Sequence, residues 1–274
     1  MRLPSCLLAG AAVSLLAACS GGNGSSSATA SPAPSPAASV VVAASPTLAG
    51  SSAPTATPAV PVQQVSFTDI SGDFGQPQIQ DEAALGILDS AGGAFKPYAP
   101  ITRAQFVRWL VKAENIYFKD AVSKQIRLAK TGPAQFVDVP VGSPDFPYIQ
   151  GLANSGYVIG IDKKHFAPNR VLTREELIAI KAPVDEGGNI QPYPGVESFL
   201  SFSDTSKINP QYATAVHEDE SVRTTRNIAR IWGALKTFSP KKPVTRSEAA
   251  IAIWEINDGS AAVALGRSAP PPPK

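Results

Sequence analysis

The sequence contains few of the residues that carry metal and thiol chemistry. Its 274 residues include only two cysteines and two histidines, and both cysteines, Cys6 and Cys19, lie near the N-terminus. That content excludes zinc sites built from paired Cys and His ligands. The sequence also lacks a glycine-rich phosphate loop and a serine elbow of the hydrolase type. We therefore expect a non-catalytic protein that needs no cofactor and no metal.

Charged residues are also scarce, and their signs nearly balance. There are 24 Lys and Arg against 22 Asp and Glu, so the formal net charge is only +2. A nucleic-acid-binding protein would carry a basic face or tail, so we expect no nucleic-acid partner. Between Arg2 and Asp69 the sequence has no charged residue. A folded part should therefore begin near residue 65.

Residues 1–18 have the features of an export signal. Arg2 precedes an apolar run over residues 7–18, which is too short to span a membrane but typical of a signal-peptide core. The run ends in Leu-Ala-Ala before Cys19, which resembles a bacterial lipobox. The alternative is an ordinary signal peptide with a chance cysteine. The resemblance implies that the thiol of Cys19 is lipidated and attaches the chain to a membrane.

Two segments predict disorder. Residues 19–64 are rich in Ser, Ala and Pro and contain neither an aromatic nor a charged residue, so they cannot bury enough apolar surface to fold. We expect them to form a flexible tether. Residues 259–274 end in four prolines and a lysine, and we expect a second disordered tail there.

Two short motifs recur three times in register between these segments. Phe-x-Asp occurs at residues 67–69, 136–138 and 202–204. Phe-x-Pro, followed by an apolar residue and Thr-Arg, occurs at 95–103, 166–174 and 238–246, and each Phe precedes its Thr by seven residues. Three copies with a fixed offset predict internal repeats. We name their residues block 1 (65–119), block 2 (134–187) and block 3 (200–258).

Each Thr-Arg pair should open a helix. The threonine is followed three residues later by Gln105, Glu176 or Glu248, which is the pattern of a capping box. Apolar residues then recur at spacings of three and four, as on one face of a helix. We expect a mainly α fold in which the six motif phenylalanines, together with Trp109 and Trp254, belong to the core.

The whole pattern resembles the S-layer homology (SLH) domain in triplicate. Block 2 is closest to the family, with Gly156 and Gly160 between its two motifs, whereas block 3 lacks such a glycine pair over residues 217–235. The resemblance implies three helix-loop-helix repeats in a pseudo-threefold unit, with the motif helices at the centre and grooves between repeats. Together with the lipobox, it indicates an envelope protein of the cyanobacterial kind.

Arg103, Arg174 and Arg246 occupy the first position of the three expected helices. A cation there opposes the helix macrodipole, so replacing it should cost little stability. Free N–H groups at a helix start, next to an arginine, can bind an anion. The alternative is an ion pair with a neighbouring acid, such as the Asp of a Phe-x-Asp motif.

In the SLH family the motif arginines lie in the grooves and hold an anionic cell-wall glycan, typically one that ends in a pyruvylated sugar. The resemblance therefore implies glycan binding by Arg103, Arg174 and Arg246. Replacing Arg174 should weaken binding most and replacing Arg246 least. Gly156 and Gly160 are expected in left-handed backbone at a helix end, bordering the groove.

The function implied is that of a lipid-anchored protein that links a membrane to a cell-wall polysaccharide or a peptidoglycan-linked glycan. Its place would be the cell envelope, either in the outer membrane or on the outer face of the plasma membrane. The alternative is a protein-interaction or assembly factor whose repeats no longer bind glycan. An envelope hydrolase is the weakest hypothesis, because no catalytic constellation is recognisable in the sequence.

Overall fold

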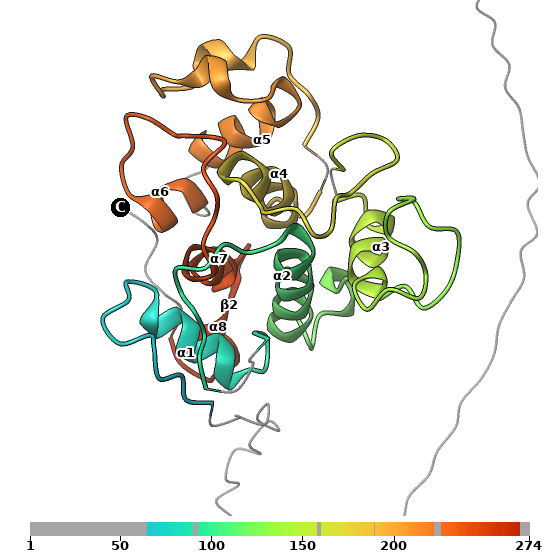
Figure 1. The fold of residues 1–274 in the computed structure, drawn as a ribbon, viewed down its shortest axis with the longest axis vertical. Helices are drawn as coiled ribbons and strands as arrows, with labels where there is room; N and C mark the ends of the chain where they lie inside the picture. Colours follow the sequence, from blue (N-terminus) through green and yellow to red (C-terminus); the bar gives the residue numbers. More distant parts are fainter. Residues whose placement is uncertain (1–64, 90–92, 158–159, 189, 222–225, 269–274) are drawn as a thin grey trace, which may run out of the picture. The chain divides into compact units, whose positions relative to one another are not determined.

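The computed structural model describes residues 65–89, 93–157, 160–188, 190–221 and 226–268 (Figure 1). All described residues belong to one unit, Pro54–Lys274. The predicted signal peptide, Cys19 and the tether over 19–64 lie outside the described residues, so they stay predictions. Within the described ranges, no helix has both the length and the apolar character needed to span a bilayer.

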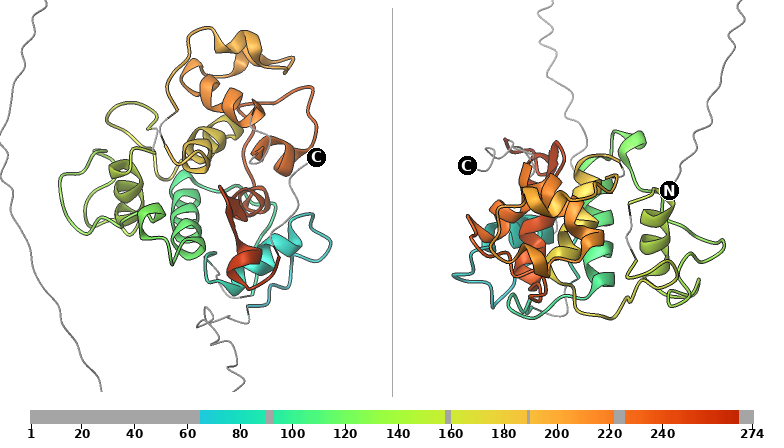
Figure 2. Two further views of the ribbon diagram at one scale, coloured as in Figure 1. Left: turned by 180° about the vertical axis from the view of Figure 1, so that it is seen from behind. Right: turned by 90° about the horizontal axis from the view of Figure 1, so that it is seen from above.

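Short helices form most of the regular structure, which confirms the mainly α prediction. The α-helices are α1 (Gln76–Ala84), α2 (Arg103–Tyr117), α3 (Phe146–Asn154), α4 (Arg174–Asp185), α5 (Pro210–Ser221), α6 (Asn227–Trp232), α7 (Arg246–Ile253) and α8 (Ala261–Ala264). Three 3₁₀ turns lie at Val122–Lys124, Val196–Phe199 and Thr205–Lys207. Figures 1 and 2 show α2, α4 and α7 in the middle of this unit, with α1, α3 and α5 farther out.

The three central helices begin at the predicted arginines, and α2 and α7 have the complete predicted capping box. In α4 the Glu176 side chain accepts the N–H of Thr173, but the Thr173 hydroxyl has no hydrogen-bond partner among the described residues. Side chains at the third helical position accept the N–H of the capping threonine at 3.2, 3.1 and 2.7 Å in α2, α4 and α7. Such a box satisfies backbone N–H groups that a helix start otherwise leaves unpaired. The local sequence is thus sufficient to fix where these helices start.

Each Phe-x-Asp motif holds the Phe-x-Pro loop of its own block. The Asp carboxylates accept pairs of backbone N–H groups: Asp69 from Phe95 and Lys96, Asp138 from Phe166 and Ala167, and Asp204 from Phe238 and Ser239. The middle residues of the three loops adopt left-handed backbone, with φ between 56° and 59°. That conformation is costly for residues other than glycine, so the two hydrogen bonds stabilise a strained loop.

The core is continuous from block to block. All six motif phenylalanines are buried, and Trp109 is fully buried, as predicted. Trp254 packs against the core while remaining partly exposed, and its indole N–H donates to Asp81 at 2.9 Å. The helices therefore share one apolar interior, in which the aromatic residues of the motifs take the same place three times.

The prediction of a disordered tail over 259–274 is wrong for its first ten residues. Glu255–Ile256 (β1) pairs with Gly259–Ser260 (β2), and α8 follows directly. The Ser260 hydroxyl caps α8 by accepting the N–H of Val263 at 3.3 Å, and Ala261 is fully buried. The apolar run of residues 261–265 therefore contributes to the core. Of the predicted tail, residues 269–274 are not among the described residues, so disorder there stays a prediction.

Block 3 differs from the expected helix-loop-helix pattern by an extra helix. Its first helix, α5, is followed by α6, which ends at Gly233, a glycine with a φ of 74°. The first helices of blocks 1 and 2 end at Gly86 and Gly156, whose φ values are 70° and 80°. A left-handed glycine is a common helix terminator because it lacks a Cβ. Block 3 thus also ends its inserted helix at a glycine with positive φ, although the ψ of Gly233 is −164° and its backbone is therefore extended rather than helical there.

Candidate binding site at the block junctions

The three blocks meet in a closed ring of backbone hydrogen bonds. Ile101 donates to Val244 at 3.0 Å, Val244 donates to Leu172 at 2.9 Å, and Leu172 donates to Ile101 at 2.9 Å. These residues precede the three Thr-Arg pairs, and isolated β-bridges join the same segments. Three equivalent segments therefore converge where the central helices begin.

The helix starts are occupied by the neighbouring block, which corrects the expectation of free N–H groups. Arg103 and Ala104 donate their backbone N–H groups to the carbonyls of Arg170 and Pro168, at 3.0 Å each. At the start of α4, the first two N–H groups donate to the carbonyls of Lys242 and Pro240. At the start of α7, they donate to the carbonyls of Ala99 and Pro97. A helix start whose N–H groups are paired offers no backbone donors to an anion.

Arg103 seals the junction between blocks 1 and 2. Its side chain is 1% exposed, and its Nε donates to the carbonyl of Phe166 at 2.8 Å. The guanidinium lies 4.7 Å from the centre of the Phe166 ring and 3.4 Å from the carboxylate of Glu176. Glu176 also pairs with Arg170. This burial contradicts the expectation that Arg103 could be replaced at little cost, and it leaves no surface for a ligand to reach in this structure.

Arg174 repeats the arrangement between blocks 2 and 3. Its guanidinium donates to the carbonyl of Phe238 at 3.0 Å and lies 3.7 Å from Glu248. It covers the ring of Trp232 at 4.5 Å, and the indole N–H donates to Glu248 at 2.7 Å. The residue is 7% exposed. The acids that pair with Arg103 and Arg174 are thus the capping-box glutamates of the next block, and the Phe-x-Asp carboxylates serve the loops instead.

Arg246 closes the ring between blocks 3 and 1 in a more open way. It donates to the carbonyls of Phe95 at 2.8 Å and Asp89 at 3.1 Å, and it covers the rings of Phe95 and Trp109. The position of the capping-box glutamate is taken here by neutral Gln105. Among the described residues, no carboxylate lies within ion-pair distance of Arg246, and the side chain stays partly exposed.

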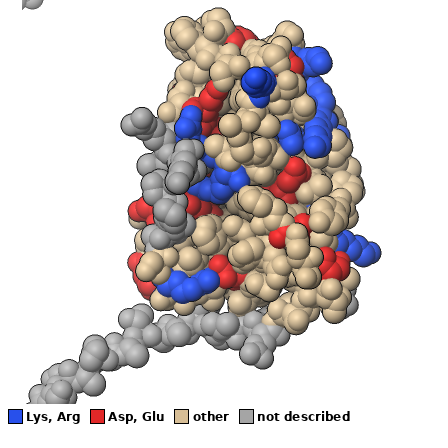
Figure 3. All heavy atoms as spheres, turned by 90° about the vertical axis from the view of Figure 1, so that its left-hand side faces the viewer, with Lys and Arg blue, Asp and Glu red and all other residues tan. Residues whose placement is uncertain are grey.

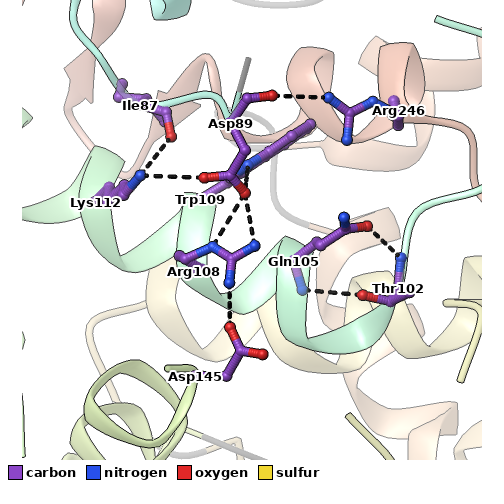
Figure 4. Close-up of polar contacts among 9 residues, drawn as sticks. All are labelled: Ile87, Asp89, Thr102, Gln105, Arg108, Trp109, Lys112, Asp145 and Arg246. Carbon is purple, nitrogen blue, oxygen red and sulfur yellow. Dashed lines mark hydrogen bonds and ion pairs between the residues drawn. The ribbon is translucent and has the colours of Figure 1, made fainter. Parts of the chain in front are cut away.

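A half-exposed cluster of charges lies beside Arg246 (Figure 4). The carboxylate of Asp89 accepts from Arg108 at 2.7 Å, from the indole of Trp109 at 3.0 Å and from Lys112 at 3.4 Å. Arg108 also pairs with Asp145 on block 2. Burial alone would raise the pKa of Asp89, but the hydrogen bonds and charge of Arg108 lower it overall, so the carboxylate is held ionised. Arg108 and Lys112 thus share two carboxylates at this junction, and Arg246 contacts only the backbone carbonyl of Asp89.

The two glycines named from the sequence have different roles. Gly156 is exposed and has the expected left-handed backbone at the end of α3. The same expectation is wrong for Gly160, whose φ is not positive. A Cβ on Gly160 would lie 2.5 Å from the carbonyl of Asp162 and 2.7 Å from that of His165, so glycine is required there by close packing.

Gly156 lies at the edge of a small cavity between blocks 2 and 3. The cavity has a volume of 230 Å³ and is lined by residues of α4, α5 and the loop between them, with Gly156 and Tyr157 at the end of α3. None of the three motif arginines lines it. The structure therefore does not bring the predicted arginines and glycines together into one site.

Charges of both signs are mixed over the surface. On the face in Figure 3, Lys and Arg side chains alternate with Asp and Glu, and neither sign covers the described surface seen there. A mixed surface of this kind gives little long-range attraction to a polyanion, so any anion binding would depend on local geometry.

Comparison with known proteins bears on block 2. Residues 135–178 match the family model described as the S-layer homology domain. No curated protein matches the chain. The matched segment contains the Phe-x-Asp motif, the glycines and the Thr-Arg pair of block 2, so block 2 is similar to the SLH domain, a kind of domain associated with binding at the cell surface or wall.

Proposed function

We propose that this protein is a non-catalytic lipoprotein of the cell envelope that binds an anionic wall polysaccharide, such as a pyruvylated one, through three SLH repeats. The lipid on Cys19 would hold it to a membrane, and the tether over 19–64 would let the repeats reach the wall. Outside residues 135–178, the support comes from the equivalent hydrogen bonds, capping boxes and arginine contacts of blocks 1 and 3.

The observation that carries the proposal is the open junction at Arg246. Its guanidinium is partly exposed and has no carboxylate partner among the described residues. Asp89 links it to two further cations, because the Asp89 carbonyl accepts from Arg246 while its carboxylate accepts from Arg108 and Lys112 (Figure 4). Lys112 makes only 3.4 Å contacts, so its ammonium group can turn toward a ligand. A carboxylated sugar would satisfy both cations by charge-assisted hydrogen bonds.

Exposure reverses the order of importance expected from the sequence. We propose Arg246 as the main glycan contact and Arg174 as a minor one, because Arg174 is nearly buried and already paired with Glu248. Arg103 would support binding only by holding blocks 1 and 2 together. Gly156 borders a cavity where a sugar could sit, and Gly160 would shape the same block from inside.

The test is binding of the full chain, carrying Cys19→Ser, to purified wall sacculi before and after removal of their attached polysaccharide. Arg246→Ala should weaken binding about tenfold or more, since a lost charge-assisted hydrogen bond contributes about 1.5–3 kcal/mol. Lys163→Ala, which removes an exposed cation of block 2, is a matched control and should bind as the parent does. If sacculi without polysaccharide bind equally well, the proposal is wrong.

One observation favours the alternative, an envelope assembly or interaction factor with degenerate repeats. The family match covers block 2 alone, and block 3 carries an additional helix. A chain that ignores sacculi but co-purifies with a defined envelope protein would support this alternative.

The lipid anchor needs a separate test, because Cys19 lies outside the described residues. In the parent, the chain should partition into the detergent phase, and Cys19→Ser should move it to the aqueous phase. A variant that still follows the membrane after a high-salt wash would refute the anchor without touching the wall-binding proposal.

A further inference from the structure

A cavity beside α5 lies away from all three Thr-Arg junctions. It has a volume of 620 Å³, within the range of small-ligand pockets. Three segments build it: the end of α4, the loop from Ile190 to Phe199, and α5. The loop is fixed to α5 by the N–H of Tyr193, which donates to the hydroxyl of Thr214 at 3.0 Å.

Aromatic rings form a chain along the wall of this cavity. The centres of the Tyr193 and Phe199 rings lie 6.0 Å apart, and those of Phe199 and His217 lie 6.1 Å apart. Tyr193 is 55% exposed and Phe199 is 61% exposed. Large aromatic side chains normally bury most of their surface, so two neighbouring exposed rings mark a contact surface for another molecule.

The charged groups of the lining have one sign. Glu186 and Glu218 line the cavity, and neither Lys nor Arg does. The pKa of Glu186 is raised, first by burial and then by the negative charges of Asp185 and Glu218. Two carboxylates that repel one another would be stabilised by a cation placed between them.

We infer that this cavity binds a ligand through an ammonium group, held against the faces of Tyr193 and Phe199 and paired with Glu186 and Glu218. Aromatic faces attract cations through their quadrupole, and carboxylates supply the opposite charge. An anionic polysaccharide is excluded, because both carboxylates would repel it. The cavity is therefore a second site with the opposite charge preference from the Arg246 junction, and it stands whether or not the chain binds wall polysaccharide.

The ammonium group can come from a lysine-type side chain of a peptide or from an amino sugar. We would titrate the full chain carrying Cys19→Ser with N-acetyl-lysine methylamide, with glucosamine and with neutral N-acetylglucosamine. Binding is followed by NMR shifts of the Tyr193, Phe199 and His217 rings. The two amines identify the source, and N-acetylglucosamine reports binding that needs no positive charge.

We expect at least one amine to shift these rings and N-acetylglucosamine to leave them unchanged. Phe199→Ala and Glu218→Gln should each weaken the amine about fivefold or more. Phe74→Ala is the matched control, because Phe74 is an exposed ring that does not line the cavity, and it should bind as the parent does. Both lining variants change exposed or partly exposed side chains, so folding should be retained and is checked by melting.

Three results would overturn the inference. The first is that neither amine shifts the rings. The second is that N-acetylglucosamine binds as tightly as the amines, which would indicate a neutral sugar site. The third is that Phe199→Ala and Glu218→Gln bind amine as Phe74→Ala does.

Discussion

The junction at Arg103 and the junction at Arg246 use the same contacts and differ in one partner. In both, the arginine Nε donates to a phenylalanine carbonyl at 2.8 Å, and the guanidinium lies 4.7 Å from the centre of that phenylalanine ring. Glu176 completes the first junction, whereas Gln105 takes its place in the second. One motif thus gives a buried, paired arginine at one junction and a half-exposed, unpaired cation at the other.

The comparison shows which contacts of the arginine depend on the repeated motif and which depend on the neighbouring block. The carbonyl and ring contacts recur because the Phe-x-Pro loop presents the same backbone in each block. The ion pair depends on the identity of the third residue of the neighbouring helix. A Thr-Arg pair is therefore not by itself evidence of ligand binding, since the partner block decides whether the arginine is available.

The largest expected effect comes from breaking the buried junction. Arg103→Ala should lower the free energy of unfolding by about 3 kcal/mol, because it leaves the buried carboxylate of Glu176 with fewer partners. Arg246→Ala should lower it by about 1 kcal/mol, since it removes exposed contacts. Urea unfolding of both variants measures the difference. Equal losses would show that the two junctions are energetically the same.

The next effect concerns a position that differs between the two junctions. Six residues before the phenylalanine that the arginine contacts, the Arg103 junction has Gly160 and the Arg246 junction has Asp89. Gly160→Ala should destabilise the protein by about 2 kcal/mol, because its Cβ would overlap two carbonyl oxygens. Gly142→Ala is the control, since a Cβ there meets nothing within 4 Å and the backbone is not left-handed. Similar melting temperatures for the two variants would contradict the packing explanation.

A third effect concerns the pH dependence of stability, which arises at a buried carboxylate outside both junctions. Glu82 on α1, the helix that packs against α7, is fully buried, and neither carboxylate oxygen has a hydrogen-bond partner among the described residues. Burial, and then the charge of Asp81, raises the pKa of Glu82 well above its ordinary value. Above about pH 4.5 the unfolded chain releases this proton while the folded chain keeps it, so stability falls as pH rises.

Glu82→Met should remove that fall and stabilise the protein by about 1–3 kcal/mol at neutral and alkaline pH, with little gain below pH 4. Unfolding curves over a pH series measure it. Glu114, whose pKa is raised to about 8 by burial, contributes a similar slope to parent and variant, so their difference isolates Glu82. Parallel curves would mean that Glu82 is not held neutral.

The smallest effect is expected from a substitution that makes the Arg246 junction resemble the Arg103 junction. Gln105→Glu should supply the missing acid next to Arg246 and raise the free energy of unfolding by about 0.5–1 kcal/mol. The same change should weaken binding of an anionic glycan there. The gain should vanish when Arg246→Ala is also present, and a gain that persists would show that the new carboxylate acts elsewhere.

Local features of this fold could be predicted from the sequence, and the site could not. Capping boxes, helix starts and the buried motif phenylalanines depend on residues within four or five positions of each other. The burial of Arg103 depends on Phe166, 63 residues away, and on a carboxylate of the next block. Nothing in the neighbourhood of Arg103 signals that partner.

Two other features were missed for different reasons. The ordering of residues 259–268 was hidden by the proline-rich end, although Asn257-Asp258-Gly259 is a typical hairpin turn and Ser260 a typical helix cap. The aromatic cavity combines single residues from a loop and two helices, with no motif to connect them. Its one sequence signal was the acidic stretch beginning at His217, which alone is typical of a solvated face.

The closed ring of Ile101, Leu172 and Val244 also determines the order in which the protein can fold. The first of these residues donates to the last, so the ring cannot close until block 3 has been synthesised. Contacts between such distant residues require closure of a long loop and slow the rate-limiting step of folding. The nascent chain must therefore keep the apolar faces of blocks 1 and 2 incompletely covered until its last helices arrive, and a truncation before Arg246 leaves both without a finished core.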